Sequence, residues 1–315
     1  MAKEFYDFIV IGAGGTGLAA AMYAARLGLR TLVLGHNNGS ELAVGGVITT
    51  TNLVENYPGF SRISGFELAK KLEEHARDYD LVEIKQEEAV DVEKKKDCFY
   101  VKTKKGSYQG KTILFATGTK WKKLPETING SRKFEGKGIN YCALCDAPLY
   151  KNKVVAVIGG SDSAAKDALV LAEHAEKVYI IYRGEKIRAE PINLRRIENN
   201  KKIEVINNTN ITEIKGNEKI KSVALDKNYN GINELNLDGI FIAIGHEILS
   251  DLAKPLNINL NKKGEIVINH KTSETNIPGV FAAGDVTDKP FKQLITGVAD
   301  GCTAAYSAYA FLNRG

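Results

Sequence analysis

The 315-residue chain carries a net charge of +5 with 43% hydrophobic and 26% charged residues, which excludes disordered and fibrous proteins and predicts two globular domains. Its cations are scattered among 38 acidic residues and no apolar run reaches the length of a membrane span, so we expect no nucleic acid and no membrane as partners. Four unevenly spaced cysteines and the absence of an apolar leader after Met1 favour the cytoplasm.

The chain begins with a predicted strand, glycine-rich turn and helix. Residues 6–11 form a short apolar run, residues 12–17 read Gly-Ala-Gly-Gly-Thr-Gly, and the alanine-rich residues 18–27 lead to Gly28 as a helix stop. A second strand is predicted at residues 31–34. This order is typical of the opening of a dinucleotide-binding domain.

The glycine spacing of the first turn predicts a pyrophosphate site. Gly12 permits the sharp reversal, Gly14 lets backbone amides approach a pyrophosphate, and Gly17 lets the helix pack closely on the strand. The acidic residue that usually follows the next strand and binds ribose hydroxyls is replaced by Leu34-Gly35. We therefore expect ribose contacts from Asn37, Asn38 or Glu41 in the following polar loop.

The rest of the chain predicts a duplicated arrangement. The first unit continues with a helix at residues 68–79 and strands at 89–92, 98–103 and 112–116. The second unit repeats the strand, glycine turn, helix and strand at residues 154–182, and continues with strands at 203–206, 211–214, 223–225 and 239–245. A strand at 279–283 and a helix at 295–312 then return to the first unit.

We accordingly predict an α/β fold of two Rossmann-like, three-layer ββα nucleotide-binding domains, the second inserted into the first. Residues 1–118 and 246–315 form the discontinuous first domain, and residues 119–245 form the second.

The second glycine turn differs from the first. Ser161 stands where the pyrophosphate-facing glycine is usual, and Tyr182-Arg183 follows the next strand in place of a carboxylate. A missing acid with Arg183 and Arg188 nearby favours a 2′-phosphate and hence NADP over NAD. A solvated basic loop remains the alternative, because Glu185 and Glu190 lie among these cations.

A C-x-x-C pair, Cys142 and Cys145, precedes the second turn and is followed directly by Asp146. At a helix start, the first thiolate is stabilised by backbone amides, and an adjacent carboxylate can carry a proton. Cys98 and Cys302 offer no second pair at metal-ligand spacing, so the pair favours redox chemistry and no metal site is expected.

Over almost its whole length the chain resembles low-molecular-weight thioredoxin reductases, of the class II pyridine nucleotide-disulfide oxidoreductase family. The stretches that carry the resemblance are residues 12–17, 45–59, 116–118, 141–146, 159–164, 183–190, 279–285 and 292–302. Counting residues 279–285 and 292–302 as one match, these are seven collinear matches, which make coincidence implausible.

The resemblance implies an FAD-dependent NAD(P)H:disulfide oxidoreductase, a homodimer with FAD in the outer domain and a nicotinamide cofactor in the inserted one. Electrons would pass from NADPH through FAD to the Cys142–Cys145 disulfide and on to thioredoxin or a glutaredoxin-like protein. It also implies that Cys145 faces the flavin, Cys142 reacts with the partner, and Asp146 is the acid–base group. The domains would reorient about hinges near Gly118 and Gly245.

The resemblance also implies the cofactor-binding positions. For FAD they are Gly12, Gly14, Gly15, Thr16, Gly17, Gly46, Asn56, Thr117, Gly118, Gly284, Asp285, Lys292 and Gln293. For the nicotinamide nucleotide they are Gly159, Gly160, Ser161, Asp162, Ser163, Arg183, Arg188 and Gly245.

Several departures from the family pattern concern the electron donor. Gly184 replaces an arginine of the 2′-phosphate motif, Ser161 replaces a glycine, and Glu247 stands where a proline is usual. Lys292 replaces an arginine, which keeps the charge and loses the bidentate fork. NADPH is the expected donor and NADH is not excluded. A ferredoxin-linked reductase, a dithiol oxidase and a non-catalytic flavoprotein that senses redox state remain as alternatives.

Overall fold

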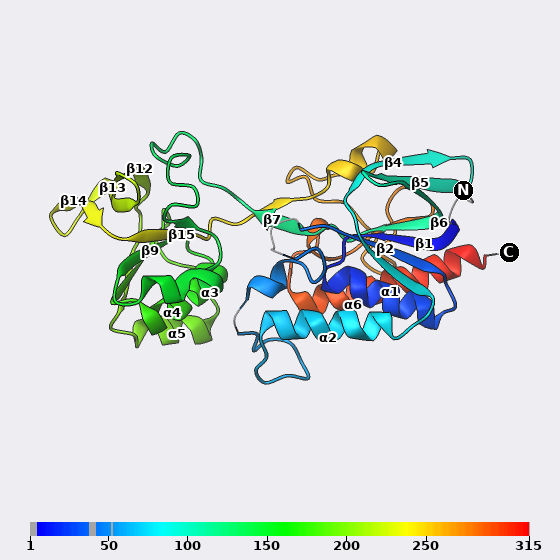
Figure 1. Ribbon diagram of the computed structural model, residues 1–315, viewed down its shortest axis with the longest axis horizontal. Helices are drawn as coiled ribbons and strands as arrows, with labels where there is room; N and C mark the ends of the chain where they lie inside the picture. The colour runs from blue at the N-terminus through cyan, green and yellow to red at the C-terminus, as the bar shows by residue number, and fades with distance from the viewer. Residues whose placement is uncertain (1–4, 38–41, 52, 315) are drawn as a thin grey trace. The chain divides into compact units, whose positions relative to one another are not determined.

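The computed structural model describes residues 5–37, 42–51 and 53–314, and the chain divides into two compact units. Unit 1 comprises Met1–Lys120 and Ile248–Gly315, and unit 2 comprises Trp121–Glu247. Unit 2 is thus an insertion in unit 1 (Figure 1). Unit 2 begins at residue 121 and ends at residue 247, whereas the sequence predicted a second domain from 119 to 245.

Unit 1 is built on a seven-stranded sheet in the order β3-β2-β1-β6-β5-β4, with β17 paired to β6. β3, β2, β1, β6 and β17 run parallel, and β6 continues into an antiparallel pairing with β5 and β4. The strands are β1 (Phe5–Ile11), β2 (Thr31–Gly35), β3 (Val82–Gln86), β4 (Ala89–Lys95), β5 (Cys98–Thr103), β6 (Ser107–Phe115) and β17 (Val280–Ala282).

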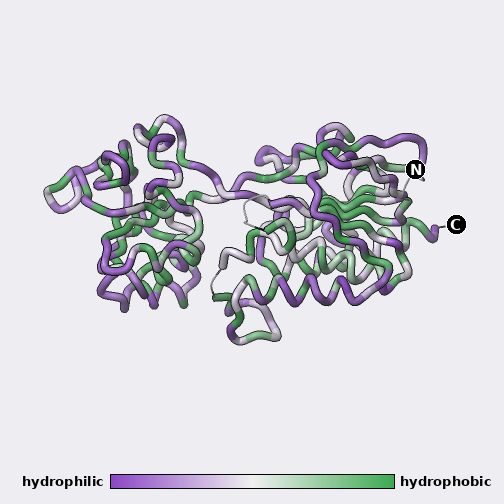
Figure 2. Tube along the Cα trace, viewed as in Figure 1, coloured by the Kyte–Doolittle hydropathy of each residue, from purple (hydrophilic) through white to green (hydrophobic). Residues whose placement is uncertain are grey.

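Three helices cover one face of this sheet: α1 (Gly15–Arg26), α2 (Gly65–Arg77) and α6 (Leu294–Leu312) (Figure 1). Because side chains alternate along a strand, Phe8 and Val10 of β1 join the core beneath the helices. Ile9 and Ile11 join the second core, which the β4–β5 hairpin and the 3-10 segment η3 (Asp251–Leu256) close. The buried strands form the hydrophobic centre visible in Figure 2.

Unit 1 also contains two further 3-10 segments, η1 (Val47–Thr50) and η4 (Gly284–Val286). η1 follows Gly46, and η4 begins at Gly284, so both segments start at positions expected to contact a cofactor.

Unit 2 contains a parallel five-stranded sheet in the order β11-β10-β9-β15-β8 and a separate antiparallel sheet, β12-β13-β14. The strands are β8 (Ile139–Asn140), β9 (Val154–Ile158), β10 (Lys177–Ile181), β11 (Ile203–Ile206), β12 (Ile211–Gly216), β13 (Ile220–Tyr229), β14 (Ile232–Asn236) and β15 (Gly239–Ile242). The helices are α3 (Ala143–Asp146), α4 (Asp162–His174), α5 (Pro191–Glu198) and the 3-10 segment η2 (Ala147–Tyr150).

The predicted α/β class with two Rossmann-like units is confirmed, but several short elements were missed, among them β3 and α5. No strand was predicted at β3, whose five residues are all half-buried or exposed, although Val82 and Ile84 alternate with Glu83 and Lys85. It also predicted no helix at α5, whose eight residues begin with Pro191 at the first helical position. Short segments of this kind take their structure from the neighbours against which they pack.

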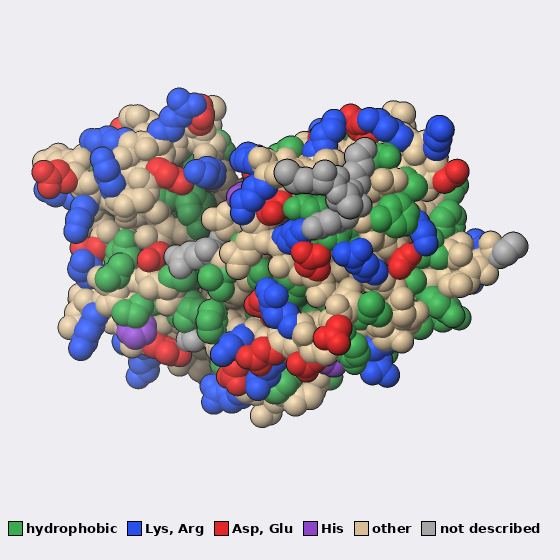
Figure 3. Space-filling model, turned by 45° about the vertical axis from the view of Figure 1, so that its right-hand side comes forward, with side chains coloured by type: hydrophobic (Ala, Val, Ile, Leu, Met, Phe, Trp, Pro, Cys, Tyr) green, Lys and Arg blue, Asp and Glu red, His purple; other side chains and the backbone are tan. Residues whose placement is uncertain are grey.

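Charges of both signs mix on the face of the molecule drawn in Figure 3, as their scatter along the sequence predicts. Many of them pair at the surface, for example Lys102 with both Asp91 and Glu93. None of the helices in the part of the chain that the structure describes has the length and apolar character to span a bilayer.

The chain passes between the units twice, and the two passages pair with each other as a two-stranded ribbon of β7 (Thr119–Trp121) and β16 (His246–Ile248). In this ribbon the rings of Trp121 and His246 lie 4.5 Å apart. Burial of the imidazole, with a smaller effect of the Lys122 ammonium, lowers the pKa of His246 below its usual value.

A lowered pKa for His246 predicts a loss of stability in acid. The unfolded chain takes up a proton at the ordinary histidine pKa of about 6.5, whereas the folded chain resists protonation, so stability is present above that pH and falls as the pH drops towards the folded pKa. His246→Phe keeps the ring against Trp121 and removes the proton. Urea unfolding at about pH 8 and about pH 5 is expected to show a smaller difference for the variant than for the wild type, and an unchanged difference would contradict this assignment.

Candidate redox and nucleotide sites

The two cysteines predicted to be redox-active form a disulfide at the start of α3. Their Cα atoms lie 5.4 Å apart, and the Cys145 N–H donates a hydrogen bond of 3.1 Å to the Cys142 sulfur. Cys142 is half-buried and Cys145 is exposed. The fold therefore offers both sulfurs of unit 2 to reagents, and a backbone amide to the sulfur that would carry the thiolate charge.

Asp146, the third predicted catalytic residue, ends α3 and acts electrostatically on Tyr150. Burial is the main cause of the raised pKa of Tyr150, Asn140 opposes it through a 2.9 Å hydrogen bond, and the Asp146 and Asp238 carboxylates add to it. The fixed Tyr150 ring, which meets the Phe241 ring edge-on at 5.3 Å, anchors the segment that follows the dithiol.

The first glycine turn is shaped by backbone contacts. A Cβ on Gly12 would lie 2.2 Å from the Ala116 carbonyl oxygen, and one on Gly17 would lie 1.9 Å from the Gly12 oxygen, so both must be glycine with or without a ligand. A Cβ on Gly14 would meet only the Gly46 Cα, at 3.8 Å. The room beside Gly14, at the N-cap of α1, is therefore open for a phosphate, which the uncapped amides of the helix would bind.

Other predicted FAD positions gather around this turn in unit 1. Gly46 backs onto Gly14, since a Cβ on Gly46 would lie 3.0 Å from the Gly14 Cα. Thr16 faces Gly284, where a Cβ would come within 2.6 Å of the Thr16 hydroxyl oxygen. These residues come from three distant segments, so the arrangement fits a dinucleotide laid across the end of the sheet. Gly15 packs instead against Leu294, which would lie 2.5 Å from an added Cβ.

Two further pairs of FAD positions meet in the same unit. Asn56 donates from its side-chain amide to the Gln293 side-chain oxygen at 3.0 Å. The Lys292 ammonium donates to the Asp285 carbonyl oxygen at 3.0 Å and also forms an ion pair with Glu265. Burial chiefly raises the pKa of the Asp285 carboxyl, and Lys292 opposes that shift. A half-buried carboxyl of this kind suits hydrogen bonding to the hydroxyls of a bound cofactor.

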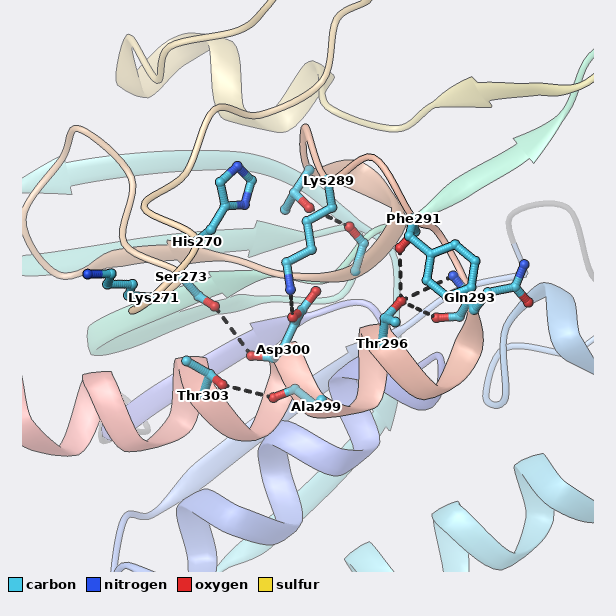
Figure 4. A network of polar contacts seen from close by, with 12 residues as sticks. His270, Lys271, Ser273, Lys289, Phe291, Gln293, Thr296, Ala299, Asp300 and Thr303 are labelled. Atoms are coloured by element: carbon cyan, nitrogen blue, oxygen red, sulfur yellow. Dashed lines mark hydrogen bonds and ion pairs between the residues drawn. The ribbon is translucent and has the colours of Figure 1, made fainter. Parts of the chain in front are cut away.

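A polar network that the sequence analysis missed joins the loop after η4 to α6 (Figure 4). Lys289 pairs with the buried Asp300, and the Ser273 hydroxyl donates to the Asp300 carbonyl oxygen at 3.4 Å. Thr296 donates to the Gln293 carbonyl oxygen at 2.8 Å, and the two residues form a capping box at the start of α6. The second carboxylate oxygen of Asp300 is buried with no hydrogen-bond partner among the described residues. The sequence feature that could have indicated this network is Asp300, an acidic residue among the mostly small and apolar residues of α6.

The loop after β2, where ribose contacts were expected, borders a cavity of about 420 Å³. Asn37 lines this cavity, whereas Asn38 and Glu41 lie outside the described residues. A Cβ on Gly35 would lie 2.5 Å from the Ala43 carbonyl oxygen, which explains why no acidic side chain stands there. The other polar side chains that line the cavity are His36, Glu73 and Gln86, and none of them was predicted.

The second glycine turn is bound to the loop that follows β10. Gly159 must be glycine, because its Cβ would lie 2.2 Å from the Ala243 carbonyl oxygen. Ser161 stands at the N-cap of α4, and its side chain makes no capping hydrogen bond with the described residues. Asp162 and Ser163 follow in the first turn of α4, and Asp162 accepts from the Glu190 N–H at 2.8 Å.

The Asp162 carboxylate is bound by Lys166, by the Asn193 side chain and by the Glu190 N–H. Burial alone would raise the pKa of its carboxyl, but Lys166, the Asn193 amide and the Glu190 N–H outweigh burial and lower it.

Arg183 and Arg188 are exposed, so both can reach a ligand. Asn207 follows β11, and its side-chain oxygen is buried with no hydrogen-bond partner among the described residues. A ligand that donates a hydrogen bond to this oxygen would satisfy it.

Three predicted cofactor positions belong to the chain passages. The Thr117 hydroxyl donates to the Leu249 carbonyl oxygen at 2.5 Å, and the Leu249 N–H donates to the Gly118 oxygen at 3.1 Å. The Lys122 N–H donates to the Gly245 oxygen at 3.1 Å.

Within the described ranges, no group of three or more His, Cys, Asp or Glu side chains could hold a metal ion.

Comparison with known proteins agrees with this geometry. A family model described as pyridine nucleotide-disulphide oxidoreductase matches residues 6–301. Thioredoxin reductase of Treponema pallidum is 36% identical over 310 residues, which cover 98% of this chain and 97% of that protein. The crystal structure of Lactococcus lactis thioredoxin reductase has a TM-score of 0.90 at 36% identity, with 98% of this chain and 99% of that chain covered. A ferredoxin-flavin thioredoxin reductase of Clostridium acetobutylicum has a TM-score of 0.52 at 30% identity, with 99% of both chains covered.

Proposed function

Because this chain belongs to the pyridine nucleotide-disulphide oxidoreductase family, we propose that it is a thioredoxin reductase that uses FAD and NADPH to reduce thioredoxin or a glutaredoxin-like protein. One observation carries the proposal: the Cys142–Cys145 disulfide lies in a unit that also holds a nucleotide-type glycine turn. FAD, when bound, supplies the two-electron chemistry that connects a nicotinamide to a disulfide.

The cysteines perform the exchange with the partner. In the reduced enzyme, the Cys142 thiolate attacks one sulfur of the partner's disulfide, which breaks that bond and forms a mixed disulfide. The Cys145 thiolate then attacks the Cys142 sulfur, releases the partner as a dithiol and restores the Cys142–Cys145 disulfide. Asp146, in the same helix, would hold the proton that the departing thiolate takes up.

The binding residues follow from the two glycine turns. In unit 1, FAD would lie against Gly14, Thr16 and Gly46, with Asp285 and the Asn56–Gln293 pair beside it. The cavity at Gly35 would take the ribose of its adenosine half. In unit 2, the nicotinamide nucleotide would lie across Gly160 and Ser161, within reach of the exposed Arg183 and Arg188.

The surface beside the dithiol favours a protein rather than a small disulfide as the substrate. Leu149, four residues after Cys145, is 70% exposed, and an apolar side chain in that position can pack against a partner. The same proposal includes a cytoplasmic homodimer, and sedimentation of the purified protein would give its oligomeric state.

A second candidate takes electrons from ferredoxin. Ser161 at the pyrophosphate position and the likeness to a ferredoxin-flavin thioredoxin reductase favour it. The donor is tested by mixing the flavin-loaded protein anaerobically with NADPH, NADH or reduced ferredoxin and following the flavin absorbance. We expect NADPH to bleach the flavin fastest. Bleaching by ferredoxin alone would support the second candidate, and no bleaching by any donor would contradict both.

A further inference from the structure

Tyr182, the first residue after β10, lies with its ring against two glycines of unit 2. A Cβ on Gly160 would lie 2.3 Å from the Tyr182 Cγ, and a Cβ on Gly184 would lie 2.6 Å from its Cε1. Gly160 and Gly184 are absent from the glycines with positive φ, so their backbone conformations are open to other residues. A side chain at either position would therefore require the tyrosine ring to move.

The backbone of Tyr182 is held by hydrogen bonds on both sides, and a cation lies near its ring. The Tyr182 N–H donates to the Ile206 oxygen at 2.9 Å, and its carbonyl accepts from the Thr209 N–H at 3.0 Å. The Arg188 N–H donates to the Gly160 oxygen at 2.6 Å, which ties the basic loop to the glycine turn. The Arg188 guanidinium lies 6.0 Å from the ring centroid, within the outer range of a cation–π contact.

The charges of this loop suit a phosphate group. Arg183 and Arg188 are exposed on either side of Gly184, and guanidinium groups bind phosphate through paired hydrogen bonds. Position 184 lies between them in the sequence, yet a side chain there would enter the space of the Tyr182 ring. The loop can thus present two arginines but not a third at its centre.

We propose that Tyr182 is a specificity-determining residue of the nicotinamide nucleotide site, because its ring keeps position 184 free of a side chain and so limits the contacts available to a 2′-phosphate. This inference rests on the proposed function. It concerns the adenosine end of the nucleotide, which binds without any redox step.

The test is a double-mutant cycle on the full-length, flavin-loaded protein, with 2′,5′-ADP and 5′-ADP titrated by calorimetry. Gly184→Arg in the presence of Tyr182 is expected to change the affinity for 2′,5′-ADP less than about twofold. Tyr182→Ala combined with Gly184→Arg is expected to bind 2′,5′-ADP about tenfold more tightly than Tyr182→Ala alone, and 5′-ADP equally, because the new side chain forms a charged hydrogen bond to the phosphate. An equal gain in both backgrounds would overturn the proposal.

Glu185→Arg is the matched control, because position 185 is exposed in the same loop and the change adds a cation without adding a side chain at position 184. Its effect should be the same with and without Tyr182. If Gly184→Arg does not fold, Gly184→Ala serves instead: its loss in melting temperature should disappear in the Tyr182→Ala background, and a loss that persists would overturn the proposal. Absence of binding of either nucleotide to the wild type would instead contradict NADPH as the donor, and this inference with it.

Discussion

Replacing Cys145 with serine is expected to abolish turnover and to leave the partner covalently attached to Cys142. In the variant, the remaining thiol can still attack the partner's disulfide, but no second thiol is present in α3 to resolve the mixed disulfide. Loss of an essential nucleophile typically lowers turnover by about a thousandfold or more. Turnover would be followed by insulin reduction with thioredoxin, and the adduct by mass spectrometry without reductant.

The two other cysteines provide the control for that experiment. Cys302 is half-buried in α6, and burial raises the pKa of its thiol to about 11, so it is protonated and unreactive near neutral pH. Cys302→Ser and Cys98→Ser should both retain turnover. An undiminished rate in Cys145→Ser would contradict the thioredoxin reductase assignment and favour a flavoprotein in which the dithiol is not catalytic.

Lys289→Met is expected to cause the largest loss of stability among the polar contacts of unit 1. Asp300 is 5% exposed, and its one paired carboxylate oxygen is bound by the Lys289 ammonium. Removing the cation leaves a buried, unpaired charge, which typically costs about 3 kcal/mol. Urea unfolding of the flavin-loaded protein would give the change in free energy.

A double variant distinguishes the cost of an unpaired charge from the loss of the Lys289 side chain's packing. Asp300→Asn combined with Lys289→Met removes both charges, so it should recover more than half of the loss. Lys254→Met is the control, since Lys254 and Asp251 form an exposed pair worth little to stability. If Lys289→Met behaved like Lys254→Met, the Lys289–Asp300 pair would not stabilise the loop on α6.

Local patterns in the sequence were sufficient for the fold class and for the dithiol. The spacing of Gly12 and Gly17 predicts a strand, turn and helix, and Gly17 packs against the Gly12 oxygen within the same short segment. Cys142 and Cys145 are three residues apart, a spacing that a helical turn brings together without help from the rest of the chain. Such features depend on neighbours in the sequence, so the sequence alone determined them.

The tertiary structure decided the contacts between segments that lie far apart in the chain. Asn56 meets Gln293 across 237 positions, and Asp300 receives its lysine from a separate loop. The tyrosine that restricts Gly160 and Gly184 stands 22 residues after the first of them, as 182 minus 160 gives. Such meetings depend on how strands and helices pack, and a residue's side chain carries no local mark of the distant group that it will contact.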